Sequence, residues 1–428
     1  MKKINISGIN ETLYHETLEN GLNIYLIPNK NVKNYYITFT TKFGSVDLEF
    51  KRDNSDYMKV PSGVAHFLEH LTFKMEGDTD ASDYLASLGC QCNAFTSYNE
   101  TCYEVYGYKN FKEALTYLID YVQTPFYTKE NVEAEKGIIC EEIKMRSDNP
   151  AVKLMEGINN SLFVKSNRRI PIAGSQKDVK STTLEDILNC YNTFYHPSNM
   201  FIIITGNFNP EEASAIIYEN QSNKDFGKPI VIKRKQITEP DKINNEFNEI
   251  KANIEIEKAS ISLKIALSEF EGLDLTKEEI SVYASIITAS NFGRSSELRE
   301  RLTSGNIITD GPYVGKYIAD DHLIISIQAE TEYPNRFINE VKEVVNNIEI
   351  TDKDLKRKKI VAISNFIVGF DSIEDINNNF MNDIIMYDRV IDNIYDIYTK
   401  LNINDATKVL EKLKTSNICI NTLKKNTD

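Results

Sequence analysis

The sequence has few of the features that mark disulfide-built or low-complexity proteins. Its 428 residues include only six cysteines, and none of them belongs to a CxxC pair of the kind that builds zinc or redox sites. The close pair Cys90-x-Cys92 has no partner donors nearby, so we expect buried thiols. Glycine (18 residues) and proline (11 residues) are also scarce. With 41% hydrophobic and 26% charged residues, the composition is typical of an ordered globular protein.

Basic residues are fewer than acidic ones, with 49 Lys and Arg against 63 Asp and Glu. The formal net charge is −14 and the pI is about 5.1, so the overall field repels phosphate backbones and anionic lipid surfaces. A local basic run, Lys233-Arg234-Lys235, stands among polar and acidic residues, and we interpret it as part of a solvated connection. We therefore expect neither nucleic acid nor a membrane as a partner.

Long apolar runs are missing too. A run such as Phe201 to Ile204 is far too short to span a bilayer. Lys2 and Lys3 follow Met1, but no apolar stretch comes after them as it would in a secretory signal. We expect a cytoplasmic protein.

The chain is long enough for at least two domains of ordinary size. In the first half, residues that alternate at period two predict strands, and apolar residues at helical spacing predict helices. The predicted strands cover residues 22–27, 35–41, 91–106 and 200–205, and the predicted helices cover 62–75, 79–88, 111–123, 129–146 and about 183–194.

The second half repeats this order of elements, with strands predicted at 254–267, 313–330 and 417–421 and a helix at 277–290. Between the halves the composition turns polar, with Pro229 and Pro240 as breaks. We therefore predict a domain over residues 1–220, a linker over 221–249 and a second domain over 250–428. The predicted class is α+β, with two similar α/β domains related by duplication at the level of architecture.

Two of the five histidines lie four residues apart in the first half, in Gly63-Val64-Ala65-His66-Phe67-Leu68-Glu69-His70-Leu71. Residues at i and i+4 share one face of a helix, so both imidazoles can reach the same ion. Glu69 lies beside that face, within reach of a water bound to the ion. This is the HxxEH order of inverted-motif zinc peptidases.

A catalytic zinc ion needs three protein ligands and one open position, so a third donor is required. Glu135 and Glu142 are seven residues apart on a predicted helix and therefore lie on one side of it, two turns from each other. One can bind the metal while the other supports it. Zinc would lower the pKa of its water toward about 7, and Glu69 would take the proton and pass it to the leaving amine.

The alternative interpretation is that His66 and His70 are ordinary helix residues and Glu69 is a surface charge. With five histidines in 428 residues, a chance HxxEH motif is expected in on the order of one in two hundred such sequences. This favours the metal site. Taken alone, Glu135 and Glu142 would indicate only an exposed acidic helix face, and the histidines make them candidates.

Four motifs occur together in the first half: Gly63-Val64-Ala65-His66-Phe67-Leu68-Glu69-His70, Asn93-Ala94-Phe95-Thr96-Ser97, Glu135-Lys136-Gly137-Ile138-Ile139 with Glu141-Glu142-Ile143, and Phe194-Tyr195-His196-Pro197-Ser198-Asn199-Met200. Together they resemble the insulinase or pitrilysin (M16) metallopeptidases, a family that includes the mitochondrial processing peptidase. The motifs are most similar to the bacterial YmfH-like branch. The family fold is two similar α/β-roll domains.

The resemblance implies a role for each motif. Glu69 would be the base, and Glu135 would be a second carboxylate important for activity. The edge strand around Asn93 and Ala94 would take up substrate as an added strand, which favours extended peptides. The implied zinc ligands are His66, His70 and Glu142, with Glu141 as the alternative carboxylate.

The resemblance also implies that the chain dimerises, as a homodimer or as a heterodimer with a related subunit, and that the dimer encloses a chamber. Family members often hold substrate with an Arg and a Tyr seven residues apart in the second domain. Arg299 matches the first of these, but position 306 is Asn, and Tyr313 is farther along. The sequence thus predicts a zinc endopeptidase whose partner supplies substrate contacts, with a catalytically silent assembly subunit as the alternative.

Overall fold

The computed structural model describes residues 1–77 and 79–426 and divides the chain into two compact units. The first unit consists of residues 1–143, 170–236 and 367–393, and the second of 144–169, 237–366 and 394–428. Each unit contains a helical segment from the other half of the sequence: residues 367–393 belong to the first unit and residues 144–169 to the second. The domains predicted from the sequence, with boundaries at 220 and 249, are instead contiguous. Asp78, Thr427 and Asp428, which fall in the predicted domains, lie outside the described residues.

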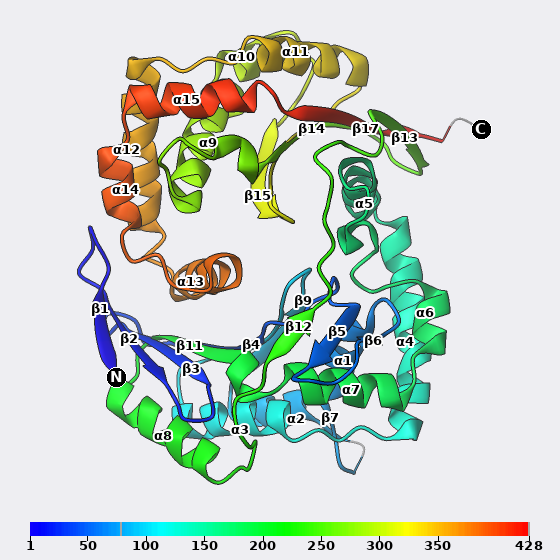
Figure 1. The fold of residues 1–428 in the computed structure, drawn as a ribbon, viewed down its shortest axis with the longest axis vertical. Coiled ribbons are helices and arrows are strands. Elements are labelled where there is room, and N and C mark those ends of the chain that lie inside the picture. The colour runs from blue at the N-terminus through cyan, green and yellow to red at the C-terminus, as the bar shows by residue number, and fades with distance from the viewer. Residues whose placement is uncertain (78, 427–428) are drawn as a thin grey trace. The chain divides into compact units, whose positions relative to one another are not determined.

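The first unit contains a seven-stranded sheet (Figure 1). Only the β3–β11 pair is parallel, and the other neighbours are antiparallel. In order across the sheet, the strands are β1 (Lys2–Asn5), β2 (Thr12–Thr17), β3 (Asn23–Pro28), β11 (Met200–Gly206), β4 (Tyr35–Thr41), β10 (Thr101–Gly107) and β9 (Gln91–Thr96).

The single strand predicted over residues 91–106 is wrong, because this segment forms the antiparallel hairpin β9–β10. The Ser97 amide donates to the Glu100 carbonyl at 2.8 Å and closes the turn. The turn sequence Ser-Tyr-Asn-Glu contains neither glycine nor proline, so the usual sequence signal of a turn is weak. The hairpin leaves β9 as the last strand of this sheet.

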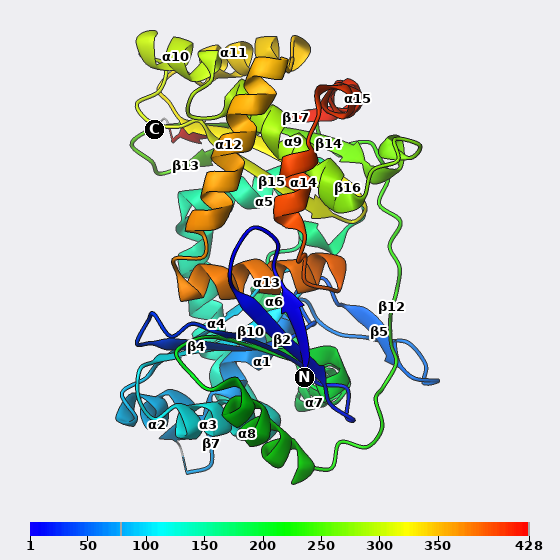
Figure 2. The same ribbon diagram turned by 90° about the vertical axis from the view of Figure 1, so that its left-hand side faces the viewer.

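Helices cover both faces of the first sheet (Figure 2). On one face, α1, α3, α7 and α8 bury a core with sheet residues such as Ile24, Phe39 and Ile204. On the other face, α13 packs against β11 and β4. The helices of this unit are α1 (Val64–Thr72), α2 (Ala81–Ser87), α3 (Phe111–Gln123), α4 (Lys129–Asp148, through residue 143), α6 (Gln176–Ser181), α7 (Leu184–Phe194), α8 (Pro210–Ser222) and α13 (Ile373–Tyr387).

Short strands complete the first unit. β12 (Ile232–Arg234) contains part of the basic run and pairs with β5 (Glu49–Arg52), which pairs in turn with β6 (Met58–Lys59). The Arg234 Nε donates to the buried Asp47 carboxylate at 2.6 Å. The basic run therefore includes part of a short strand, while Lys233 and Lys235 are exposed to solvent, as predicted for this segment. A second hairpin joins β7 (Lys74–Met75) and β8 (Thr79–Asp80).

The second unit contains a five-stranded sheet whose only parallel pair is β13–β17. In order, its strands are β13 (Phe247–Ala252), β17 (Asn417–Lys425), β14 (Lys258–Ala266), β16 (His322–Glu330) and β15 (Tyr313–Ala319). Its helices are α5 (Pro150–Leu162), α9 (Lys277–Phe292), α10 (Glu297–Ser304), α11 (Pro334–Asn346), α12 (Asp352–Val368, through residue 366), α14 (Ile394–Lys400) and α15 (Ile403–Leu413).

The two sheets share one topology, which confirms the predicted duplication. The order β3-β11-β4-β10-β9 in the first unit corresponds to β13-β17-β14-β16-β15 in the second. In each, the first pair is parallel and the next three are antiparallel. Along the chain, α1 and α2 lie between β4 and β9 in the first unit, and α9 and α10 lie between β14 and β15 in the second. Helix α9 therefore occupies the place of α1.

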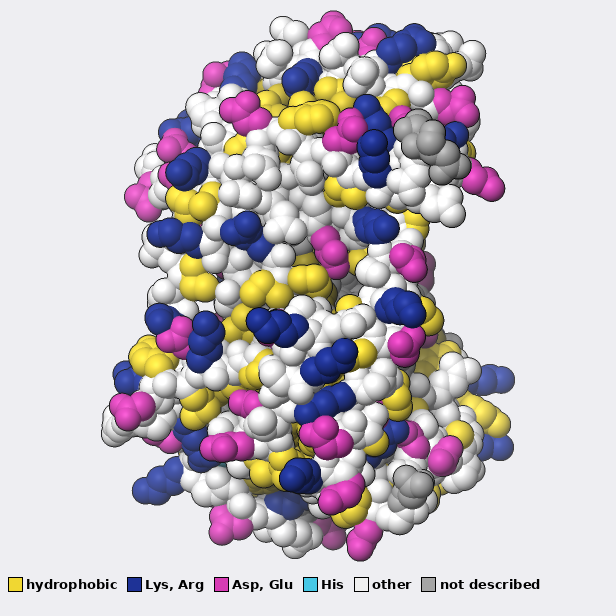
Figure 3. All heavy atoms as spheres, turned by 90° about the vertical axis from the view of Figure 1, so that its right-hand side faces the viewer, with side chains coloured by type: hydrophobic (Ala, Val, Ile, Leu, Met, Phe, Trp, Pro, Cys, Tyr) yellow, Lys and Arg dark blue, Asp and Glu magenta, His cyan; other side chains and the backbone are white. Residues whose placement is uncertain are grey.

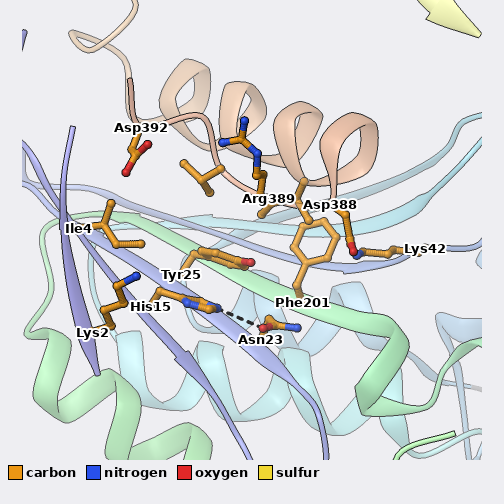
Figure 4. A pocket seen from close by; sticks show the side chains of 12 residues that line it. Lys2, Ile4, His15, Asn23, Tyr25, Lys42, Phe201, Asp388, Arg389 and Asp392 are labelled. Carbon is orange, nitrogen blue, oxygen red and sulfur yellow. Dashed lines mark hydrogen bonds and ion pairs between the residues drawn. The ribbon is translucent and has the colours of Figure 1, made fainter. Parts of the chain in front are cut away.

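A cavity of about 440 Å³ lies in the first unit, between the β1–β3 end of the sheet and the chain that follows α13 (Figure 4). His15 stacks on Tyr25, with ring centroids 4.6 Å apart, and its Nε2 lies 3.1 Å from Asn23 Oδ1. Lys42 pairs with Asp388 at the other side. None of the residues that line this cavity belongs to the HxxEH motif or to the acidic helix α4.

The face of the molecule shown in Figure 3 carries side chains of both charges. On the face shown in Figure 3, acidic and basic side chains are interspersed, without a continuous basic area among the described residues. Over the same described residues, no helix combines the length and the apolar character that a membrane crossing requires.

Candidate active site

The helix that carries the two histidines starts at a close crossing of two loops. Gly63, just before α1, has φ +83°, and a Cβ there would lie 2.3 Å from the Ala173 carbonyl oxygen. Gly174 has φ +74°, and its Cβ would lie 2.4 Å from the Ser62 carbonyl oxygen. The Ser62 hydroxyl also donates to Asp178 Oδ2 at 2.5 Å. Glycine is needed at both positions, and the crossing fixes where α1 begins.

The sequence of α1 then decides which side chains face the core. Val64, Phe67, Leu68 and Leu71 are buried in the hydrophobic cluster of the first unit. His66 is buried, His70 is partly exposed, and their ring centroids lie 4.6 Å apart. The two imidazoles therefore meet on one face of the helix, as their spacing predicts.

Helix α4 brings its carboxylates to these imidazoles. Glu142 Oε1 lies 3.6 Å from His66 Nε2, and Glu142 Oε2 lies 3.3 Å from His70 Nε2. Two turns earlier, the buried Glu135 places its Oε1 2.9 Å from His70 Nδ1. Val132 and Ile139 are buried, so the helix packs into the core and holds both carboxylates in place.

These donors fit a tetrahedral zinc ion. One nitrogen or oxygen atom from each of His66, His70 and Glu142 lies within 4.8 Å of the other two. Bonds of roughly 2.0–2.1 Å at tetrahedral angles place neighbouring ligand atoms about 3.4 Å apart. Glu142 Oε2 lies near this distance from His70 Nε2, at 3.3 Å, and the other oxygen of Glu142 lies 3.6 Å from His66 Nε2. Two imidazoles and one carboxylate are also the ligand set of many catalytic zinc sites.

Glu135 sits behind His70 and not among the converging donors. A carboxylate that accepts the Nδ1 proton of a histidine leaves the Nε2 lone pair for a metal and fixes the ring orientation. Lys74 Nζ lies 3.9 Å from Glu135 Oε2 on the other side. Among the described residues, His66 Nδ1 is buried without such a partner, so the two histidines are held differently.

The electrostatics of the cluster favour a cation. Burial opposes a charge on His70, but hydrogen bonds to Glu135 and Glu142 outweigh it and raise the His70 pKa to about 9. Hydrogen bonds from His66 and His70 hold the pKa of Glu142 well below its usual range. Carboxylates thus concentrate negative charge where the imidazoles converge, and a divalent cation would satisfy that charge.

Glu69, the predicted base, is bound by Thr96, a residue to which the sequence alone assigned no role. Its Oε2 accepts a hydrogen bond from Thr96 Oγ1 at 2.5 Å. Thr96 is the last residue of β9, and α1 contacts this strand. Period-two alternation places Thr96 on the same face as Ala94 and was the signal that could have found it.

Asn93 and Ala94 lie on β9, the terminal strand of the first sheet. Ala94 packs on the hydrophobic core, and Asn93 is exposed and pairs across the hairpin with Glu104. Burial raises the pKa of Glu104, although hydrogen bonds from Tyr36 and Asn93 oppose the change. The uptake of substrate along this strand stays a prediction.

Arg299 lies on α10 in the second unit and is grouped with Tyr313, not with position 306. The Arg299 guanidinium donates to the Gly311 carbonyl and lies 3.7 Å from Asp310 Oδ1. The Tyr313 hydroxyl donates to the other oxygen of Asp310 at 2.7 Å. Asn306 instead occupies a turn with φ +50°. A substrate role for Arg299 stays a prediction.

A helix with two histidines and an intervening glutamate, joined by a glutamate from a later helix, defines the class of inverted-motif zinc metallopeptidases. The insulinase (peptidase family M16) model matches residues 56–175, which include all of these side chains. A second model, the peptidase M16 inactive domain, matches residues 181–361. The chain belongs to peptidase family M16, a family of zinc proteases.

Relatives match over nearly the whole chain. The chain is 32% identical to the uncharacterized zinc protease YmfH of Bacillus subtilis over 418 residues, covering 96% of each chain. It is 25% identical to an uncharacterized zinc protease of Rickettsia felis, covering 94% of this chain and 96% of the relative. A putative M16-like peptidase from Alicyclobacillus acidocaldarius has a similar structure, with TM-score 0.90, 23% identity and coverage of 98% and 99%.

Proposed function

We propose that the protein is a zinc-dependent endopeptidase that hydrolyses extended peptides at the cluster formed by α1 and α4. The observation that carries this proposal is the convergence of His66, His70 and Glu142 within 4.8 Å, with Glu69 directly before His70 on α1. The M16 family membership and the relatives named as zinc proteases support it. Zn²⁺ is the proposed cofactor.

His66, His70 and Glu142 would hold the ion, which when bound supplies Lewis acidity for the attacking water and the scissile carbonyl. Glu69 takes the proton from the water and delivers it to the leaving amine. Glu135 keeps the His70 ring turned so that its Nε2 faces the ligand cluster. The free edge of β9 would align the substrate backbone, with Asn93 and Ala94 on the pairing strand.

The alternative is a catalytically silent assembly subunit that keeps the fold. A silent subunit has no chemical need for a base, yet Glu69 is present and its carboxylate is held by Thr96. This arrangement favours the enzyme.

We further propose that the chain works as the catalytic subunit of a dimer that encloses a chamber, with Arg299 contributing to substrate binding. A heterodimer with a related M16 subunit would explain why position 306 is Asn. In that case the chain alone cleaves an extended peptide poorly, and full activity of the purified chain would count against a heterodimer. The cytoplasmic location stays a prediction.

The decisive experiment replaces Glu69 with Gln. The variant keeps all three proposed ligands and loses the base, so we expect wild-type zinc stoichiometry by elemental analysis and loss of hydrolysis of an extended fluorogenic peptide. If a partner subunit is needed, the assay uses the co-purified complex. Unchanged turnover by Glu69→Gln would refute the role of the base.

A further inference from the structure

The one hydrogen bond that the described residues make to the Glu69 side chain comes from the edge strand. Thr96 Oγ1 donates to Glu69 Oε2 at 2.5 Å, a short distance typical of a hydroxyl on a carboxylate. Glu69 is on α1 and Thr96 is on β9, 27 residues later. The contact therefore joins the helix of the proposed metal ligands to the strand at the edge of the sheet.

The position of Thr96 on β9 explains how the contact arises. Side chains alternate along a strand, so Cys92, Ala94 and Thr96 share one face. Cys92 and Ala94 pack on the core of the first unit, and α1 contacts both β9 and β10. The Thr96 hydroxyl is thereby aimed at α1, while the main chain of β9 faces outward along the sheet edge.

This contact has a chemical consequence for the base. A glutamate side chain on a helix can occupy several rotamers, and only some of them aim a carboxylate oxygen at the ligand cluster. A hydroxyl that binds Oε2 selects among these rotamers and leaves Oε1 for the attacking water. Because Thr96 is β-branched, its own χ1 angle is restricted, so the donor is itself fixed.

We propose that Thr96 is a positioning residue that orients the Glu69 carboxylate and thereby links the edge strand to the base. Resting on the proposed peptidase function, this inference assigns β9 two tasks: its backbone pairs with the substrate, and its last side chain holds the base. A substrate strand seated on β9 is then in register with the proton acceptor. The two groups are placed by one element of structure.

The test compares Thr96→Val with Thr96→Ser. Valine keeps the shape and the β-branch but removes the hydroxyl, whereas serine keeps the hydroxyl. For Thr96→Val we expect a fall in kcat of about tenfold with KM and zinc stoichiometry unchanged, because only the orientation of the base is lost. We expect Thr96→Ser to recover most of the wild-type kcat.

Thr38→Val is the matched control. Thr38 is a buried threonine of the same sheet whose hydroxyl donates to Asn377 Oδ1 at 2.7 Å, so it reports the general effect of removing such a hydroxyl. The inference is overturned if Thr96→Val retains wild-type kcat. It is also overturned if Thr96→Val and Thr38→Val lose kcat equally, or if the loss follows a loss of zinc.

A second measurement separates this inference from the proposed function. Crystal structures of zinc-loaded wild type and Thr96→Val show whether the Glu69 carboxylate changes its orientation, whatever the activity. A rotated carboxylate in the variant supports the positioning role even if the wild type hydrolyses no peptide. An unchanged Glu69 rotamer in Thr96→Val contradicts the positioning role even if the enzyme is active.

Discussion

The two units share one arrangement of edge strand and helix, but the side chains that join the two elements differ between the units. In the first, the edge strand β9 reaches α1 through the bond from Thr96 to Glu69. Between the corresponding strand and helix of the second unit, Lys316 of β15 donates to the Ser281 hydroxyl and to the Ser281 carbonyl of α9, the latter at 2.8 Å. The shared topology brings an edge-strand side chain onto the first helix in both units. The residue types decide whether chemistry results.

Charge is balanced differently in the two units as well. In the second, the buried Lys264 Nζ donates to Glu239 Oε1 at 2.7 Å and to the carbonyls of Leu162, Pro240 and Lys242. Glu239 also accepts three backbone N–H bonds from residues 164–166. This pair is satisfied within the protein and is structural. The carboxylates around His66 and His70 instead favour an external cation.

The largest expected effect comes from removing a proposed metal ligand of the first unit. Glu142→Gln removes the proposed anionic ligand from α4, so we expect loss of bound zinc and a fall in peptidase activity of at least about 10³-fold. Ser281→Ala alters a side chain of α9 in the second unit, which holds none of the proposed ligands, and should leave both unaltered. Stoichiometric zinc in Glu142→Gln, measured by elemental analysis, would contradict the assignment.

Breaking the buried pair of the second unit should affect stability and not the metal. Lys264→Met leaves Glu239 buried without its cation, and we expect a loss of about 3–5 kcal/mol in the free energy of unfolding. The pKa of Glu239 is lowered because hydrogen bonds from Lys264 and the backbone outweigh its burial. The stability that ionised Glu239 contributes to the folded protein is therefore fully present above pH 4.5, and it is lost as the pH falls through the lowered pKa of Glu239.

Denaturant unfolding of the wild type and of a variant without both charges, Lys264→Met with Glu239→Gln, tests this explanation. The double variant should be more stable than Lys264→Met alone and should lose less stability in acid. Equal acid sensitivity in the wild type and the double variant would show that other groups cause the loss.

Removing the support behind His70 should have a smaller effect than removing a ligand. Glu135→Gln keeps a side chain of the same shape and weakens the acceptor for His70 Nδ1, so we expect zinc affinity to fall about 10–100-fold. Competition with a chelator measures this. The exposed Glu133, on the same helix, provides the control Glu133→Gln, which should bind zinc like the wild type.

The smallest effect concerns the second unit at alkaline pH. Burial lowers the pKa of Lys316 to about 8, below its usual value near 10.5. Between these two values the unfolded chain binds more protons than the folded one, so this group makes stability rise with pH. Lys316→Met should remove that contribution, and urea unfolding at pH 7.5 and 10 would detect it. The same pH dependence of stability in the wild type and in Lys316→Met would contradict this role of Lys316.

Much of this fold could be predicted because the local sequence signals agree with the structure that forms. The prediction of a helix over 111–123 coincides with α3, where apolar residues recur at helical spacing. The histidine helix was predicted over 62–75 but spans Val64–Thr72, because Gly63 is left-handed and Lys74–Met75 pair with β8. The first sheet also includes β1 and β2, which the sequence patterns do not predict, and the helix that packs on its second face, α13, comes from far along the chain.

The site was predictable where residue type and spacing coincide, and not where contacts depend on tertiary structure. His66 and His70 lie close together because a helix places residues four apart on one face. The position of Glu135 behind His70, and that of Thr96 at Glu69, depend on how α4 and β9 pack against α1. Tyr313 joins Arg299 only because residues 306–311 turn back between them.

The crossing of Gly63 and Gly174 makes two distant stretches of sequence depend on each other. Each backbone occupies the volume that a side chain on the other would need, so neither position can acquire a larger residue unless the opposite loop retreats. Such a retreat would shift the first turn of α1 and carry the His66 imidazole with it. The loop before α6, which supplies none of the proposed ligands, thus constrains where they can converge.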